Sequence, residues 1–320
     1  MIDTYNIIII GGGPAGISAG IYGKYDGNRP LILEAKTLAW IPKNHVNLLG
    51  KLEGFPALLN TINGNELIDR FKDSLNEMKV EYRENTRVNS IVQKGSNFIV
   101  NTNAVNYKTN AVVLATGTLP LKLPNNLVGD YKKDVFYFAY NKFKNYINKE
   151  VVVLGSRNSG SSAAIYLAKH GLKVTIIEIK PEIQAKEKYT KYFKELGVRT
   201  ITNAIVKKLS GKNKKLQFLY FSSNDIEYRI NCQAIFCYIG IVPNIKLASS
   251  LGVKLDENNY VSTNFYQTTN IDGIFVAGDI CGDLKHIIAA CGQGAKAAYN
   301  VNKYLNYMDG VKSLNNEFKE

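Results

Sequence analysis

The chain has 320 residues, of which 45% are hydrophobic and 21% charged, a composition typical of folded proteins and not of disordered or membrane-embedded ones. This length exceeds one ordinary core and fits two domains. The first apolar run, Ile7–Ile10, stops at three glycines and is too short for a signal peptide or a membrane span. We therefore expect a cytoplasmic protein with no membrane partner.

The formal net charge of +13 is concentrated in one segment. Residues 121–244 hold 21 Lys and Arg against 9 Asp and Glu, whereas the rest of the chain holds 19 against 18. A basic surface attracts acidic partners, although a solvated basic surface without a partner gives the same pattern. Nucleic acid is disfavoured because the charges are scattered and no nucleic-acid-binding motif accompanies them.

The four cysteines, Cys232, Cys237, Cys281 and Cys291, lack the C-x-x-C spacing of a redox or zinc site. We expect small buried side chains in a reducing compartment and no metal. The spacing of five between Cys232 and Cys237 predicts opposite faces of one strand.

The chain repeats itself at an offset of 144 residues. A strand, a glycine-rich turn, a helix and a second strand are predicted over residues 5–36 and again over residues 149–180. Gly11, Gly16 and Glu34 of the first copy match residues 155, 160 and 178 of the second. Short alternating strands follow each copy, at 86–108 and 201–230, and then a buried strand that ends in glycine. Two related domains explain this pattern.

The second domain is predicted to be inserted into the first. Glycine and proline at residues 117–120 and 240–243 are typical of paired hinges. After the second hinge come one more strand, residues 273–279, and a helix from about Asp283 to Leu305. The fold class is thus α/β, with two Rossmann-like domains built on parallel sheets with short antiparallel meanders. The first domain spans residues 1–118 and 245–320, and the second spans residues 119–244.

The first glycine-rich turn has the pattern of a dinucleotide site. Gly11 makes the tight turn, Gly13 lets the backbone approach a pyrophosphate, and Gly16 lets the helix meet the strand. The helix N-terminus favours negative charge, and Glu34 can accept hydrogen bonds from ribose hydroxyls.

The order of these motifs resembles that of the thioredoxin reductase-like flavoproteins, over nearly the whole chain. The shared segments are residues 11–16, 115–117, 238–244 and 269–279, followed by the helix segment 287–295. The resemblance implies an FAD-dependent oxidoreductase that forms a homodimer. It also implies an FAD site made of Gly11, Gly13, Pro14, Ala15, Gly16, Glu34, Ala35, Thr116, Gly117, Gly278, Asp279, His286 and Ile287.

The second turn departs from the pattern, because Arg157 stands where the middle glycine belongs. Arg157 either pairs with phosphates or blocks the site. Glu178 favours NADH, while nearby lysines keep NADPH open. If a nicotinamide cofactor binds here, its site is made of Gly155, Arg157, Asn158, Ser159, Gly160 and Glu178.

The redox dithiol of the family's reductases is missing. Phe138 and Asn141 stand at the two positions where those reductases carry Tyr-Cys-x-x-Cys, and neither residue forms a thiolate. The spacing of Cys281 and Cys291 does not predict a substitute pair. We therefore expect an enzyme that moves electrons between a nicotinamide cofactor and an external acceptor by direct contact with the flavin.

Direct contact also occurs in ferredoxin–NAD(P) reductases of the thioredoxin reductase type, which the turn at residues 278–281 resembles. Together with the basic segment, this resemblance favours a small acidic partner such as ferredoxin. Residues 35–50 resemble instead a dithiol-oxidase-like subgroup. In that segment His45 is a candidate to hydrogen-bond the flavin or donate a proton to it, and His286 is a second catalytic candidate.

Two other functions stay open. The chain could be a thioredoxin reductase-like flavoprotein that does not use NAD(P)H. Arg157 argues against a nicotinamide site, and residues 179–183 lack the His-Arg-Arg run that NADPH-using members of the family carry after the second strand. It could also be a non-catalytic, FAD-bound module whose second domain binds a partner.

Overall fold

The computed structural model describes residues 2–39, 55–56, 62–139 and 142–317. Contacts between residues divide the chain into two compact parts. Within the described residues, unit 1 combines the chain up to Leu119 with the chain from Pro243 onward, and unit 2 is the intervening segment Pro120–Val242. The two connections, β7 (Thr118–Pro120) and β16 (Ile241–Pro243), pair with each other as a two-stranded sheet.

Unit 1 is built on one mixed sheet. Among the described residues its strand order is β3-β2-β1-β6-β5-β4. The strand β17 is off this path and pairs with the last residues of β6, whereas β5 pairs with the first residues of β6. The strands are β1 (Asp3–Ile10), β2 (Pro30–Leu33), β3 (Glu81–Arg83), β4 (Val88–Lys94), β5 (Asn97–Thr102), β6 (Asn106–Leu114) and β17 (Ile274–Val276). Because β3, β2, β1, β6 and β17 are parallel, their carboxyl ends meet at one edge of the sheet.

Alternating side chains of β1 enter two separate cores. Ile7 and Ile9 pack under the helices of unit 1, whereas Ile8 and Ile10 pack on the opposite face against Phe98 of β5. All four isoleucines are 5% exposed or less. A strand buried on both faces reads as a continuous apolar run, which explains the sequence Ile-Ile-Ile-Ile.

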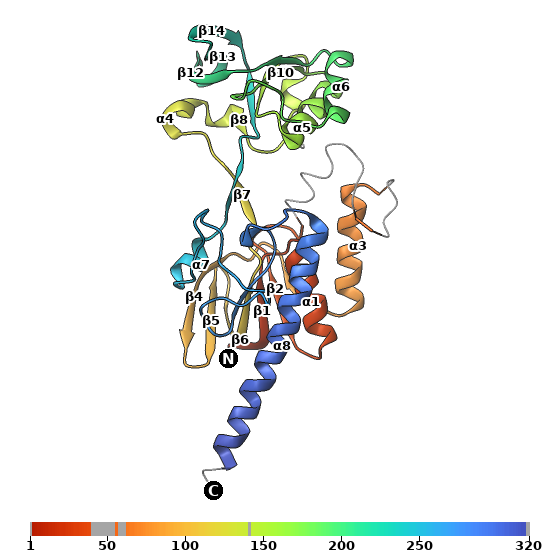
Figure 1. The fold of residues 1–320 in the computed structure, drawn as a ribbon, viewed down its shortest axis with the longest axis vertical. Helices are drawn as coiled ribbons and strands as arrows, with labels where there is room; N and C mark the ends of the chain where they lie inside the picture. Colours follow the sequence, from red (N-terminus) through yellow and green to blue (C-terminus); the bar gives the residue numbers. More distant parts are fainter. Residues whose placement is uncertain (1, 40–54, 57–61, 140–141, 318–320) are drawn as a thin grey trace. The chain divides into compact units, whose positions relative to one another are not determined.

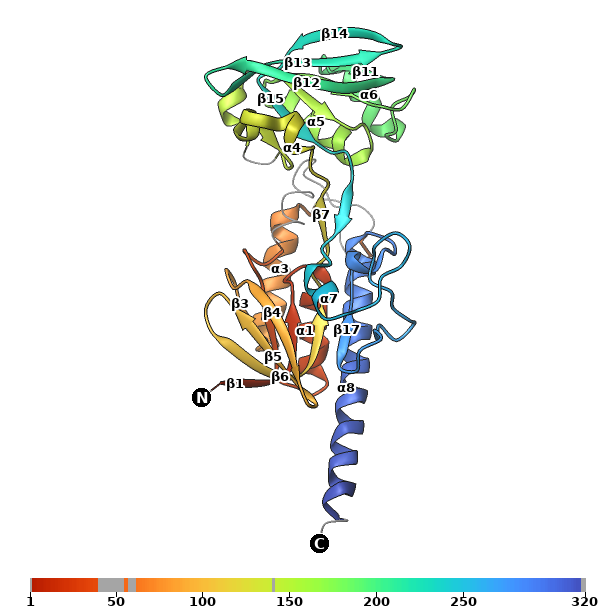
Figure 2. The same ribbon diagram turned by 90° about the vertical axis from the view of Figure 1, so that its left-hand side faces the viewer.

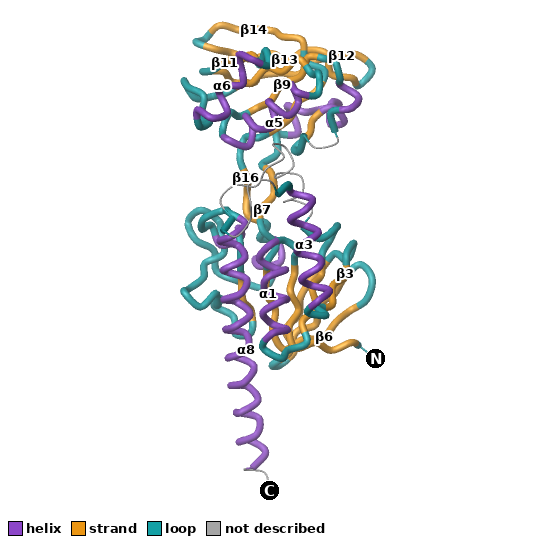
Figure 3. The backbone as a smooth tube through the Cα atoms, turned by 90° about the vertical axis from the view of Figure 1, so that its right-hand side faces the viewer, coloured by secondary structure: helices purple, strands orange, loops and turns teal. Residues whose placement is uncertain are grey.

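Three helices, α1, α3 and α8, lie side by side over one face of this sheet (Figure 3). The helices of unit 1 are α1 (Pro14–Tyr25), α3 (Gly64–Glu77), α7 (Lys246–Ser250) and α8 (Ile287–Glu317), with the 3₁₀ turn η3 (Asp279–Cys281) before α8. The carboxyl-terminal turns of α8 extend beyond the sheet (Figure 1).

Unit 2 repeats the parallel arrangement and adds an antiparallel meander. A five-stranded sheet of order β11-β10-β9-β15-β8 is accompanied by the three-stranded sheet β12-β13-β14 in the described part of the chain (Figure 2). The strands are β8 (Val135–Phe136), β9 (Glu150–Leu154), β10 (Lys173–Ile177), β11 (Arg199–Ile201), β12 (Ala204–Lys212), β13 (Lys215–Ser223), β14 (Ile226–Asn231) and β15 (Ala234–Cys237). The helices are α4 (Asn125–Val128), η1 (Gly129–Asp134), η2 (Lys144–Tyr146), α5 (Asn158–Lys169) and α6 (Glu187–Glu195).

The predicted fold class is confirmed, including the parallel sheets and both antiparallel meanders. Two details were wrong. The last helix begins at Ile287 and runs to Glu317, so residues 283–286 precede it. Cys232 lies before β15 and not on it, and its side chain packs in the same core as Cys237 because the chain bends between them.

Candidate functional site

The first glycine-rich turn connects β1 to α1 at the carboxyl edge of the sheet. Gly11 has a φ of +111°, and a side chain on it would collide with the backbone carbonyl of Ala115 at the end of β6. A side chain on Gly16 would collide with the carbonyl of Gly11. These two contacts explain why the turn needs glycine at both positions.

Gly13 has a different role, because a side chain there would meet no atom of the described chain within 4 Å. Its φ of −79° is open to any residue, so neither strain nor crowding requires glycine at this position. Gly13 is also the N-cap of α1 and provides no side-chain cap, and Pro14 follows it. The first N–H groups of α1 are thus left for a ligand, and the helix dipole favours an anion there.

Glu34 follows β2 beside this turn. Its Oε2 accepts a hydrogen bond from the N–H of Gly12 at 2.7 Å, and its Oε1 accepts one from the N–H of Lys36 at 2.8 Å. A carboxylate has about four lone-pair positions, so Glu34, which is partly exposed, can accept more. Ala35, next to it, is also partly exposed.

The segment before α8 reaches the same edge of the sheet. Gly278, with a φ of +86°, follows β17, and its N–H donates to Oε1 of Gln293 at 2.8 Å. The Nε2 of Gln293 donates to Asp283 at 3.0 Å, so this one side chain holds both ends of the turn. Burial raises the pKa of Asp279 above its ordinary value, while Lys285 and His286 act in the opposite direction. The sequence analysis missed Gln293, whose role depends on the folded turn.

The start of α8 packs against the start of α1. Gly294 has no room for a side chain because the backbone carbonyl of Ala15 lies against it, and the Sγ of Cys291 lies 3.8 Å from the carbonyl oxygen of Pro14. His286 is the exposed residue directly before α8, and Ile287 is its partly buried first residue. The Gly-rich turn and the turn at Asp279 are therefore neighbours.

The carboxyl end of β6 completes this edge. The Oγ1 of Thr116 donates to the carbonyl of Asn244 at 2.8 Å, and the N–H of Asn244 donates to the carbonyl of Gly117 at 2.9 Å. Two of the predicted positions, His45 and Asn141, lie outside the described residues, and Phe138 is partly buried in unit 2. Unit 1 thus brings together the predicted FAD-site residues, all of which are described.

These features fit a dinucleotide. Open space at Gly13 admits a pyrophosphate, the uncapped start of α1 supplies N–H donors, and Glu34 has acceptor positions left for a ribose. The arrangement agrees with the general rule that ligands of parallel sheets bind at the carboxyl ends of the strands.

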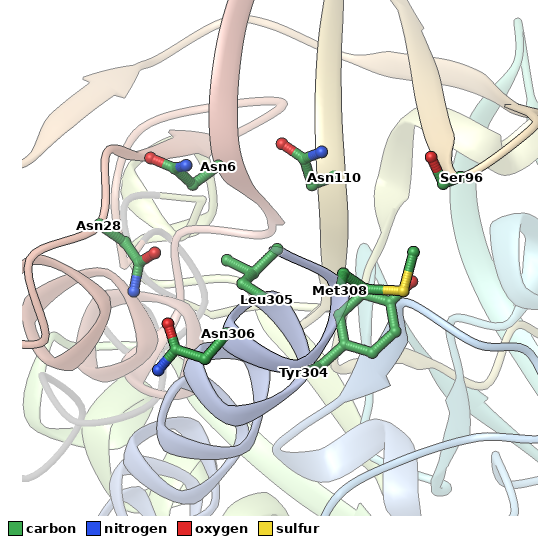
Figure 4. Close-up of a pocket in the computed structure, with 8 residues that line it drawn as sticks. All are labelled: Asn6, Asn28, Ser96, Asn110, Tyr304, Leu305, Asn306 and Met308. Atoms are coloured by element: carbon green, nitrogen blue, oxygen red, sulfur yellow. The ribbon is translucent and has the colours of Figure 1, made fainter. Parts of the chain in front are cut away.

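A small polar pocket of about 150 Å³ lies elsewhere in unit 1 (Figure 4). It is lined by Asn6, Asn28, Ser96, Asn110, Tyr304, Leu305, Asn306 and Met308. Several of these amides are already paired, for example Asn28 with Asn302 at 3.2 Å. The pocket is lined by Asn6 and Asn110 from the middle of β1 and β6 and not by the carboxyl ends of these strands, so it is separate from the dinucleotide site.

The second glycine-rich turn lies between β9 and α5 of unit 2. Gly155, with a φ of +92°, and Gly160 repeat the crowded contacts of the first turn. Arg157 is exposed and is the N-cap of α5, and the next two residues, Asn158 and Ser159, are exposed as well. Glu178, in contrast, is only 6% exposed.

The four cysteines are all described and all are free thiols. Burial raises the pKa of Cys281 to about 12 and that of Cys291 to about 11, and burial likewise raises the pKa of Cys232 and of Cys237. Since the thiolate is the redox nucleophile, these environments disfavour disulfide exchange at neutral pH.

Slow alkylation of the folded protein is the expected consequence. At pH 8 the pKa of about 11 for Cys291, against an ordinary value of 9.0, lowers its thiolate fraction about a hundredfold. Iodoacetamide labelling followed by mass spectrometry should therefore be about a hundredfold slower than in the urea-unfolded chain, and should accelerate above pH 9. Rapid labelling of Cys281 or Cys291 at pH 7 would show a reactive thiol.

Comparison with known proteins identifies the family. The model of the pyridine nucleotide-disulphide oxidoreductases matches residues 5–294, so the chain belongs to that family. The chain is 29% identical to the thioredoxin reductase of Listeria innocua, covering 94% of each chain. It is 28% identical to the "34.2 kDa protein in rubredoxin operon" of Clostridium pasteurianum, covering 94% of this chain and 97% of that one.

Among solved structures, the thioredoxin reductase of T. acidophilum matches with a TM-score of 0.85 at 29% identity, covering 94% of this chain and 98% of that one. The chain is thus a flavin-dependent oxidoreductase with the thioredoxin reductase fold, and its cofactor is FAD. No helix in the described residues is long and apolar enough to cross a membrane.

Proposed function

We propose that this enzyme exchanges electrons between its flavin and a small acidic electron-transfer protein such as ferredoxin, by direct contact and without a dithiol relay. The observation that carries the proposal is the state of the thiols. No C-x-x-C is present in the chain, and all four cysteines have raised pKa values. A relay needs a thiolate that attacks a disulfide, and none of these thiols provides one at neutral pH.

The residues of unit 1 position the flavin in this proposal. Glu34 would accept from the adenosine ribose, the start of α1 would hold the pyrophosphate, and Asp279 would accept from the ribityl region. The bound flavin supplies transfer of a hydride or of single electrons. The start of α8 would place its positive end near the ring, where it favours negative charge.

The charge of unit 2 supports an acidic partner. Its residues include 21 Lys and Arg against 9 Asp and Glu, and many of these cations are exposed, as in β12 and β13. Opposite fields raise association rates by roughly 10- to 1,000-fold, and this gain falls as salt screens it. The relative from the rubredoxin operon is named for the operon of an electron-transfer protein, which agrees with such a partner.

The test is reduction of the bound flavin by prereduced ferredoxin under nitrogen, with stopped-flow absorbance as the readout. We expect rapid bleaching whose second-order rate falls about tenfold or more between low and high salt. The variant carrying Cys281→Ser and Cys291→Ser should react at the rate of the unchanged protein. Loss of the reaction in this variant, or no reaction with ferredoxin at any salt concentration, contradicts the proposal.

A matched pair of triple variants separates steering by unit 2 from the effect of net charge. Lys207→Glu, Lys212→Glu and Lys215→Glu together reverse exposed charges in unit 2. The control variant reverses three exposed lysines of unit 1, Lys94, Lys254 and Lys303, and changes the net charge equally. The first variant should lose about tenfold in rate at low salt and the control much less. Equal losses would assign the effect to net charge alone.

A further inference from the structure

The carboxylate of Glu178, in unit 2, accepts three hydrogen bonds from its own chain. Its Oε2 accepts from the N–H of Ser156 at 2.8 Å and from the Oγ of Ser156 at 2.6 Å, and its Oε1 accepts from the N–H of Lys180 at 3.0 Å. Burial alone would raise its pKa, but hydrogen bonds from the hydroxyl of Ser156 and from backbone N–H groups lower the pKa below its ordinary value. Three donors occupy three of the roughly four lone-pair positions of this carboxylate, and Glu178 is only 6% exposed, so little of it is left for a ligand.

The internal repeat provides a direct comparison with Glu34. Both carboxylates accept from the turn and from the residue two positions further on, Lys36 in unit 1 and Lys180 in unit 2. In the described residues, Glu34 receives only these two bonds and is partly exposed. Glu178 receives the hydroxyl of Ser156 in addition, because serine stands at the position that Gly12 has in the first copy.

Ser156 also ties the following segment over the turn. Its Oγ accepts a hydrogen bond from the N–H of Gln184 at 2.9 Å, and Oδ1 of Asn158 accepts one from the N–H of Lys186 at 3.1 Å. In a Rossmann fold the adenosine ribose and its 2′ substituent bind beside the acidic residue that follows the second strand. In unit 2, backbone N–H groups of the chain itself are already bonded to the side chains of Ser156 and Asn158 at this place.

The pyrophosphate position is altered as well. Gly13 leaves open space at the start of α1, whereas the equivalent residue of the repeat is Arg157. A side chain at this position stands where the backbone would approach the phosphates. The second turn thus differs from the first at both contacts that a dinucleotide needs, and its residues do not fit NADH or NADPH.

We propose that Ser156, through its bonds to Glu178 and Gln184, closes the ribose corner of unit 2, and that this unit does not bind NADH or NADPH. The protein would then be a flavoprotein that does not use NAD(P)H, and not an enzyme that exchanges electrons with a nicotinamide cofactor. Electrons would then enter and leave through protein partners at the flavin. The inference stands on unit 2 alone and does not depend on the nature of the acceptor.

The test uses the FAD-loaded protein and isothermal calorimetry with NADH, NADPH and ADP-ribose. We expect no saturable binding to the unchanged protein up to about 1 mM, and no bleaching of the flavin by either nicotinamide under nitrogen. The variant carrying Ser156→Gly and Arg157→Gly restores the glycines of the first turn. It should bind NADH or ADP-ribose at least about tenfold more tightly, since one acceptor position of Glu178 is released.

Ser159→Gly is the matched control, because it removes an exposed hydroxyl from the same turn without touching Glu178. It should bind no more tightly than the unchanged protein. Should the double variant fail to fold, Ser156→Gly alone removes both bonds of the hydroxyl and permits the same comparison.

Saturable binding of either nicotinamide to the unchanged protein below about 1 mM overturns the inference. A folded glycine variant that gains no affinity overturns the role of Ser156. Neither result affects the ferredoxin experiment, which contains no nicotinamide, so the two proposals can fail separately.

Discussion

Replacing Gly13 with glutamate is expected to give a folded protein that does not bind FAD. A Cβ at this position would meet no described atom of the chain within 4 Å, and the backbone conformation suits any residue, so we expect the fold to be kept. The carboxylate would occupy the pyrophosphate position and repel the phosphates. We expect affinity for FAD to fall by on the order of a thousandfold, which corresponds to about 4 kcal/mol.

The measurement is fluorescence titration of the apoprotein with FAD, with the thermal unfolding midpoint as the check on folding. Tyr25→Glu is the control, because Tyr25 is 75% exposed at the other end of the same helix. Its affinity for FAD should be unchanged. A yellow Gly13→Glu protein would place the cofactor elsewhere and refute the site described above.

Replacing Glu178 with alanine is expected to destabilise unit 2 by about 3–5 kcal/mol. The change leaves the N–H and hydroxyl of Ser156 without their acceptor in a buried place, and the N–H of Lys180 without its acceptor in a partly buried one. Each lost partner costs about 1–3 kcal/mol, and the costs overlap. Unfolding in urea, with hydrogen exchange of the β9 and β10 amides as the readout, reports on this unit selectively.

Glu182→Ala provides the comparison, since Glu182 is exposed on the same segment and should change stability by less than about 0.5 kcal/mol. Acid should mimic the Glu178 substitution. Because the pKa of Glu178 is lower in the folded state, its contribution is complete above its ordinary value of 4.5 and disappears as the pH falls through the folded value. Equal stability of the two variants at pH 7 would contradict the buried network.

The sequence could predict the fold because its signals are local or repetitive. The 144-residue offset and the apolar run at Ile7–Ile10 determine the two parallel sheets, and the glycines mark the turns by their conformational demands. The end of α8 was predicted at Leu305, and asparagine and glycine, which are poor helix formers, follow that residue. The structure continues the helix through them.

The site was only partly predictable, because some contacts exist only after folding. The sequence reveals serine at the position of Gly12, yet its significance depends on where Gln184 lies in space. Gln293 likewise bridges Gly278 and Asp283 only when α8 packs behind the turn. Side-chain networks of this kind have no period, so no pattern along the chain indicates them.

The interleaved order of the two units has a consequence for synthesis on the ribosome. Unit 1 needs β17 and α8 from the last part of the chain, including Gly294 against Ala15, whereas unit 2 is complete once residue 242 has emerged. Domains fold as units during translation, so the inserted unit can form first. Flavin uptake must then wait until the polypeptide is nearly finished, and nascent chains that stop before β17 would be released without cofactor.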